Sequence, residues 1–138
     1  MGQEHPETLR AMGNLAATYR FQGKWDDAQK LEEQVLELRI RLMGQEHPFT
    51  LLTMGNLAAT YWSLRKWDKA QELQEEVLEV TGRILGQEHP HTLTAISNLA
   101  CTYREIGATS RSIELLEMAI EKQHRILGHE HHHTLNTK

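Results

Sequence analysis

Residues 44–62 have the sequence GQEHPFTLLTMGNLAATYW, and parts of this segment recur at equivalent positions along the chain. Gly-Gln-Glu-His-Pro begins at Gly2, Gly44 and Gly86, each 42 residues after the last, and a degraded copy, Gly-His-Glu-His-His, begins at Gly128. Self-similarity at a fixed period of roughly 20–50 residues is the signature of a repeat architecture. The sequence therefore predicts one repeat domain over residues 1–138, with units at 1–43, 44–85 and 86–127 and a partial fourth unit at 128–138.

Each unit carries two stretches with helical periodicity. In the first unit, apolar residues recur at steps of three and four, which places them on one face of a first helix, termed A. Its residues are Leu9, Met12, Leu15, Ala16 and Tyr19. After Gln22-Gly23-Lys24 the spacing resumes in a second helix, termed B, through Trp25, Ala28, Leu31, Val35, Leu38 and Leu42. We interpret Trp25, Trp67 and the three tyrosines as core residues, and Glu32 with Glu33 as a solvated face.

Proline and glycine mark the expected helix boundaries. Pro6 stands where helix A begins, a position that tolerates its missing N–H, and the residue before a proline avoids helical geometry. His5, His47 and His89 are therefore boundary residues. Gly44, Gly86 and Gly128 are expected to close the preceding B helices, because a left-handed residue satisfies the last carbonyls and glycine adopts that conformation cheaply. Arg65 replaces Gly23 in the second unit, where the turn favours glycine.

Composition excludes several classes of protein. The 138 residues carry a net charge of −4 and no block of Lys or Arg that could follow a phosphate backbone, so nucleic acid is not an expected partner. No apolar run reaches the roughly 18 residues of a membrane span, and the N-terminus lacks a signal-peptide pattern. A single cysteine, Cys101, excludes an internal disulfide. We expect a cytoplasmic protein that binds no membrane.

The repeated positions resemble the tetratricopeptide repeat. In the first unit they are Asn14, Leu15, Ala16, Tyr19, Gly23, Trp25 and Ala28. The 42-residue period and the His-Pro, Thr-Leu and Asn-Leu-Ala wording resemble the kinesin light chain type of this repeat. The resemblance covers the whole chain. It implies an all-α, right-handed superhelical solenoid of antiparallel helix pairs, and a module that binds another protein or peptide.

The resemblance also implies where a ligand would bind, since in this family the A helices line a concave groove. The positions carried over are Arg10, Asn14, Ala17, Arg20, Leu52, Asn56, Ala59, Trp62, Asn98, Cys101 and Arg104. An asparagine repeated at one helical position can donate to and accept from a peptide backbone. The row of Arg20, Trp62 and Arg104 favours ligands with acidic and aromatic residues, and Trp62 is expected to be exposed. The alternative is that the asparagines bond within the helices and the arginines are solvated surface charges.

No enzymatic activity, cofactor or metal is expected. His129 to His133 contain the string H-E-x-x-H, which on a helix could hold zinc, but its alignment with Gly-Gln-Glu-His-Pro places it in a connector. A zinc-dependent hydrolase is kept only as a remote alternative, and adventitious binding of nickel or zinc by these histidines stays open. The main alternative to peptide binding is self-association, through stacking of uncovered repeat ends or through a role as a spacer.

Overall fold

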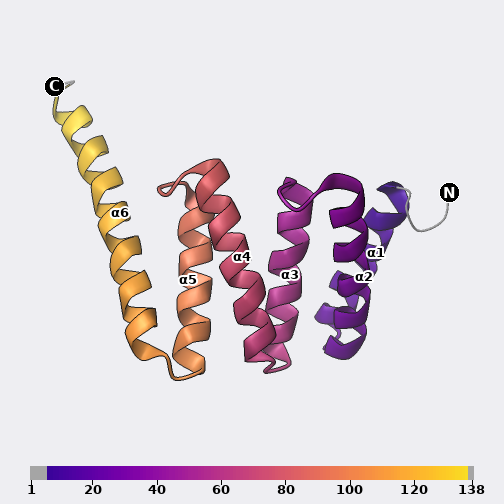
Figure 1. Ribbon diagram of the computed structural model, residues 1–138. Helices are drawn as coiled ribbons and strands as arrows, with labels where there is room; N and C mark the ends of the chain where they lie inside the picture. Colours follow the sequence, from indigo (N-terminus) through magenta and orange to yellow (C-terminus); the bar gives the residue numbers. More distant parts are fainter. Residues whose placement is uncertain (1–5, 137–138) are drawn as a thin grey trace. The chain divides into compact units, whose positions relative to one another are not determined.

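The computed structural model describes the backbone of residues 6–136 and the side chains of residues 7–125. These residues form helices connected by short turns, without a strand (Figure 1). The helices are α1 (Pro6–Phe21), α2 (Trp25–Met43), α3 (Pro48–Ser63), α4 (Trp67–Leu85), α5 (Pro90–Glu105) and α6 (Thr109–Asn136). Helices α1, α3 and α5 are the predicted A helices, and α2, α4 and α6 are the B helices. The prediction of an all-α repeat of helix pairs is confirmed.

The turn inside each helix pair has the same hydrogen bonds. After α1, Lys24 N donates to Tyr19 O at 2.8 Å and Gly23 N donates to Arg20 O at 3.0 Å, with Gly23 at a φ of 78°. This arrangement is a Schellman turn, which needs one left-handed residue. Arg65 fills that position after α3 with a φ of 63°. The second unit therefore places a side chain where the turn favours glycine, as the sequence predicted.

Histidine and proline start α3 and α5. The Nδ1 atom of His47 accepts a hydrogen bond from Phe49 N at 3.0 Å, and His89 Nδ1 accepts one from His91 N at 3.1 Å. Both histidines have extended backbones and are followed by proline at the first helical position. The imidazoles therefore act as N-caps, which satisfy an N–H group that has no partner inside the helix. The predicted role of histidine as a boundary residue is confirmed at both sites.

The prediction that Gly128 ends a B helix is wrong. Helix α6 continues through this residue to Asn136. Gly44 and Gly86 are followed by His-Pro, but the degraded copy has His132 where the other copies have proline. Without proline, the preceding residue keeps access to helical geometry and every N–H can bond, so one glycine does not stop the helix. The H-E-x-x-H string consequently lies on α6 rather than in a connector, and its side chains lie outside the described residues.

The chain divides within α4 into two compact units, Met1–Val77 and Leu78–Lys138. In the first compact unit α2 packs against both α1 and α3. Its buried clusters consist of Leu9, Val35 and Leu38 with Met12, and of Leu57, Tyr61 and Ala70 with Leu36, Trp62 and Leu73. In the second compact unit α5 packs against α6, and the cluster consists of Leu93, Ile96 and Ala119 with Leu78 and Leu115.

The predicted core residues differ in burial according to which helix carries them. Tyr61 and Tyr103 are buried, whereas Tyr19, Trp25 and Trp67 are only partly buried. Leu15, predicted to be in the core, is 45% exposed, while its counterpart Leu57 is 2% exposed. Leu57 packs in a cluster with Leu36 of α2, the B helix before α3, whereas the residues that the structure describes include no B helix before α1. None of the described helices is long and apolar enough to cross a membrane.

Candidate peptide-binding groove

A pocket of about 340 Å³ lies among α1, α2 and α3, within the first compact unit. We call it the α1–α3 groove. Its lining comes from all three helices: Arg10, Gly13, Asn14, Ala17 and Arg20 of α1, Glu32, Val35, Arg39 and Met43 of α2, and Phe49, Leu52, Thr53 and Asn56 of α3. A volume of this size accommodates a few side chains rather than a folded domain.

Helical spacing explains which side chains reach this groove. Arg10, Asn14 and Ala17 recur at steps of three and four, so they share one face of α1. Leu9 and Ala16 lie on a different face and are buried. On α3, Leu52 and Asn56 repeat the same positions one period later. The A helices therefore present polar and small residues on one side while their apolar residues hold the fold together.

The groove brings together only part of the predicted site. Arg10, Asn14, Ala17, Arg20, Leu52 and Asn56 all line it. Ala59 and Trp62 belong to the same compact unit as the groove but do not line it. On α5, in the second compact unit, Asn98, Cys101 and Arg104 are exposed to solvent. Ligand contact by each of these residues stays a prediction.

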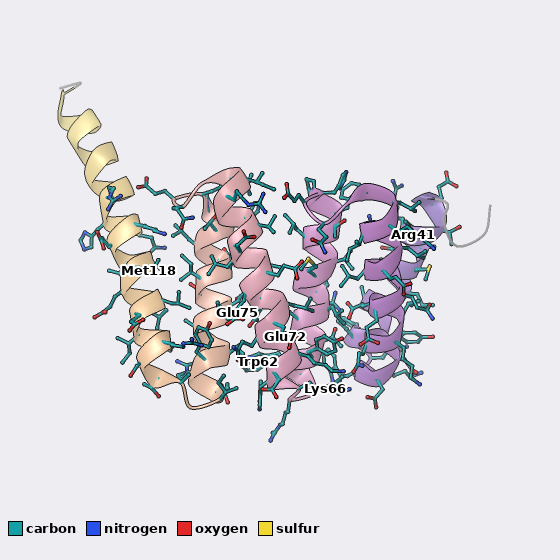
Figure 2. The ribbon with its side chains drawn as sticks, viewed as in Figure 1. Arg41, Trp62, Lys66, Glu72, Glu75 and Met118 are labelled. Carbon is teal, nitrogen blue, oxygen red and sulfur yellow. The ribbon has the colours of Figure 1, made fainter. Side chains whose placement is uncertain are left out.

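Trp62 is not the freely exposed aromatic side chain that the sequence predicted. It lies near the end of α3 and is partly buried (Figure 2). Its rings pack against the cluster of Leu57, Tyr61 and Ala70, and it meets Trp67 edge to face with ring centroids 5.0 Å apart. Packing in this cluster explains the tryptophan without a ligand.

The interpretation of Glu32 and Glu33 as a solvated face is wrong. Glu32 is 4% exposed, and it accepts a hydrogen bond from Thr60 Oγ1 at 2.5 Å. Its other oxygen lies 3.4 Å from Arg20 Nε. Burial raises the pKa of Glu32, and this effect is partly offset by the Thr60 hydrogen bond and the charge of Arg20. Glu33 accepts a hydrogen bond from Tyr61 Oη at 2.5 Å, so both glutamates join α2 to α3.

The groove has an excess of positive charge. Three guanidinium groups line it, against the single carboxylate of Glu32. Among the described residues no carboxylate pairs with Arg10 or Arg39. Burial, and secondarily the charge of Arg10, lower the pKa of Arg39. Arg20 Nε is already paired with Glu32, so Arg10 and Arg39 are the guanidinium groups left to bind an anion in this groove.

The groove residues on α2 and at the start of α3 were not predicted from the sequence. Arg39 lies over the ring of Phe49, with its guanidinium carbon 5.3 Å from the centroid, and its Nη1 lies 3.9 Å from Met43 Sδ. Phe49 stands where the other units have Glu7 and His91. This departure from the repeat was a usable signal. The contribution of Arg39 could be found only once the face that α2 turns to α1 and α3 was known.

Residues 7–125 contain no group of three His, Cys, Asp or Glu side chains placed to hold a metal ion. The arrangement of the groove is instead suited to binding through charge, amide groups and apolar contact.

Two family models match the chain, both described as tetratricopeptide repeat, over residues 8–49 and residues 49–123. The chain belongs to the tetratricopeptide repeat family. Its array is of the kinesin light chain type, as the wording of the repeat predicted. As a helical repeat solenoid of this family, the chain is a protein-interaction module. No curated protein matches it.

Solved structures give the same fold. The nearly identical TPR-like repeats of a putative kinesin light chain from Podosopora anserina align with a TM-score of 0.82 and 31% identity, over 91% of this chain and 60% of that one. BtubC from P. vanneervenii aligns with a TM-score of 0.78 and 23% identity, over 86% and 46% of the two chains. The N-terminal domain of stress-induced protein-1 from C. elegans gives 0.66 and 15%, over 84% of each chain. The tetratricopeptide module thus spans 60% of the length of the kinesin light chain structure.

Proposed function

We propose that this tetratricopeptide module binds an extended peptide in the α1–α3 groove, with an acidic side chain of the peptide placed between Arg10 and Arg39. The observation that carries the proposal is the charge of the lining. Glu32 is the single carboxylate there, and its oxygens are already engaged by Thr60 and Arg20. Two guanidinium groups are left for a ligand, and planar guanidinium matches a carboxylate with paired hydrogen bonds.

Other groups of the groove suit the rest of such a peptide. Phe49 and Leu52 are both more than half exposed, so an apolar or aromatic side chain next to the acidic one would cover them. Asn14 and Asn56 occupy equivalent positions on α1 and α3 and line the groove from two helices. Their carboxamides can donate to and accept from the peptide backbone, which holds an extended chain without demanding a particular sequence.

The test is binding of fluorescent acidic-aromatic peptides, chosen from a peptide array, to Arg10→Ala and Arg39→Ala variants. Losing one charged hydrogen-bond partner should weaken affinity by roughly tenfold. Lys30→Ala is the matched control, because Lys30 is an exposed cation of α2 outside the lining and its loss should leave affinity unchanged. A peptide with an amide in place of the acidic side chain should bind wild type about as weakly as the acidic peptide binds the arginine variants.

Replacing Glu32 gives a change in the opposite direction. Glu32→Gln removes the negative charge from the lining while the amide oxygen can still accept from Thr60, so affinity for an acidic peptide should rise severalfold. Equal affinity of wild type, Arg10→Ala and Glu32→Gln for the same peptide would show that the ligand binds elsewhere. Self-association, the alternative expected from the sequence, concerns different surfaces of the chain.

A further inference from the structure

A second pocket, of about 400 Å³, lies among α2, α3 and the start of α4. We call it the α2–α4 groove. All of its lining residues belong to the first compact unit, and none of them lines the α1–α3 groove. Helices α2, α3 and α4 each have a described helix on either side of them along the chain. This groove is therefore a feature of the interior of the array.

The floor of the α2–α4 groove is apolar and only partly covered. Leu57 is buried at its base. Leu36 and Leu73 pack against the buried cluster around Leu57 but remain partly exposed, and Ile40 is partly exposed as well. An apolar side chain laid on these residues would remove further apolar surface from water. One part of a suitable ligand is therefore apolar.

The rim of this groove has an excess of negative charge. Glu33, Glu37 and Glu72 line it, against the single ammonium group of Lys69. Glu37 and Glu72 are exposed, and among the described residues no cation forms an ion pair with either. Glu33 accepts its hydrogen bonds through Oε2, which leaves Oε1 for a ligand. The charge complement of this rim is a cation.

The aromatic ring in this groove already attracts positive charge. Lys69 Nζ lies 5.5 Å from the centroid of Tyr61, and the guanidinium carbon of Arg111 lies 5.5 Å from that of Tyr103 one unit later. The face of an aromatic ring is negative, so a cation is stabilised there. Burial and the hydrogen bond to Glu33 raise the pKa of Tyr61, and nearby carboxylates add to this effect. The hydroxyl therefore stays protonated and keeps Glu33 in place at the rim.

We propose that the α2–α4 groove binds a segment of a partner protein in which an arginine or lysine stands next to an apolar residue. The apolar side chain covers Leu36 and Leu73, and the cation is held by Glu37 and Glu72. Lys69 is the chain's own cation in this groove, so it competes with the ligand.

The first compact unit then has two grooves of opposite charge. On α2 the α1–α3 groove uses positions 32, 35, 39 and 43, whereas the α2–α4 groove uses positions 33, 36, 37 and 40. These sets lie on different faces of the helix, so an acidic and a basic ligand can bind at the same time. The proposal for the α2–α4 groove does not depend on peptide binding in the other groove.

Fluorescence anisotropy with two labelled peptides tests the proposal. One peptide has two arginines alternating with leucines, and its copy has uncharged citrulline in place of each arginine. The arginine peptide should bind at least about tenfold more tightly than the citrulline peptide. Glu37→Gln and Glu72→Gln should each weaken its binding about three- to fivefold, and together by more than about tenfold. Asp27→Asn is the matched control, because Asp27 is an exposed carboxylate of α2 outside the lining.

Lys69→Ala should change affinity in the opposite direction. It removes the competing ammonium group, so the arginine peptide should bind severalfold more tightly. Lys69, Glu37 and Glu72 are all exposed, and circular dichroism checks that their variants remain helical.

Three results would overturn the proposal. The first is equal affinity for the arginine and citrulline peptides, and the second is wild-type affinity in the double variant of Glu37 and Glu72. The third is an oligomer of the wild-type chain alone that this double variant abolishes, since a second copy would then occupy the groove. Arg10→Ala should bind the arginine peptide as wild type does, and the double variant should bind the acidic-aromatic peptides as wild type does. Failure in one groove is thus distinguishable from failure in the other.

Discussion

Arg65 holds a φ of 63° in the turn after α3, where the other two units have Gly23 and Gly107. Its backbone N–H still donates to Trp62 O at 3.0 Å, so the turn is complete despite the side chain. A left-handed conformation costs a residue with a Cβ atom roughly 1–2 kcal/mol, whereas glycine adopts it freely but loses more entropy on folding. The second unit therefore carries a local strain that its neighbours lack.

Arg65→Gly should raise the free energy of unfolding by about 0.5–1 kcal/mol, the relief of strain less the added chain entropy. Urea unfolding followed by circular dichroism measures the change. The reciprocal control is Gly107→Arg, which should lower stability by a similar amount, since Gly107 has a φ of 87° in the equivalent turn. If both variants moved stability in the same direction, backbone strain would not explain the effect.

Glu32 links stability to pH with a defined sign. Burial raises its pKa above the ordinary value of 4.5, so the folded state binds a proton more readily than the unfolded state does. Ionisation of Glu32 therefore costs stability, and this cost is complete above the raised pKa and disappears as the pH falls toward 4.5. Glu32→Gln should be more stable than wild type at pH 7, and the difference should shrink as the pH is lowered.

Urea unfolding of both proteins at several pH values measures that difference, in which the contributions of other carboxylates largely cancel. Gln74 occupies the same position in the second unit, so glutamine is compatible with the repeat. A difference that grew as the pH fell would mean that the ion pair with Arg20, rather than burial, dominates at Glu32.

At the scale of a helix, the ends of these elements depend on proline more than on glycine. Helices α3 and α5 begin at Pro48 and Pro90 after a histidine N-cap, and α2 ends at Met43, before Gly44. Helix α6 passes through Gly128 because no proline follows. His-Pro is thus the part of the repeat that separates one unit from the next.

His132→Pro should restore this separation. A proline there removes a helical hydrogen bond and pushes residue 131 out of helical geometry, at a cost of roughly 3 kcal/mol to a continuous helix. We expect hydrogen–deuterium exchange of the amides at residues 128–131 to become faster, while His132→Ala leaves their exchange unchanged. Equal exchange in both variants would mean that the backbone at this position does not depend on proline.

At the scale of the whole molecule, local signals were sufficient for the fold. Helix pairs, their turns and the strained Arg65 follow from periodicity, proline and glycine, all of which act within a few residues. Burial at the contacts between units was not accessible in this way. Leu15 and Leu57 have the same sequence context, yet Leu57 is buried with Leu36 of α2 and Leu15 is 45% exposed. Glu32 is buried because Thr60 of the next unit docks on it.

The candidate site likewise contains residues that could be predicted from the sequence and residues whose positions depend on packing. The family resemblance, carried over from one unit to the next by repeat register, predicted Arg10, Asn14, Ala17, Arg20, Leu52 and Asn56, because one repeat position maps to one face. Arg39 and Met43 enter the groove from α2, and which face of α2 turns inward depends on packing rather than on spacing. Trp62 was misjudged for the same reason, since its exposure is decided by Trp67 and the neighbouring cluster.

The hydrogen bond between Thr60 and Glu32 also bears on how the chain assembles. Units with similar sequences create a risk during folding, because an A helix could dock on the B helix of the wrong unit and still match its apolar surface. Position 32 differs in every unit: a carboxylate in the first, the amide of Gln74 in the second and the alkyl group of Leu116 in the third. Each B helix therefore has a different side chain at this position of its docking surface. The buried carboxylate that α3 contacts is the one that α2 carries. Units with similar helices can still be sorted into the right order.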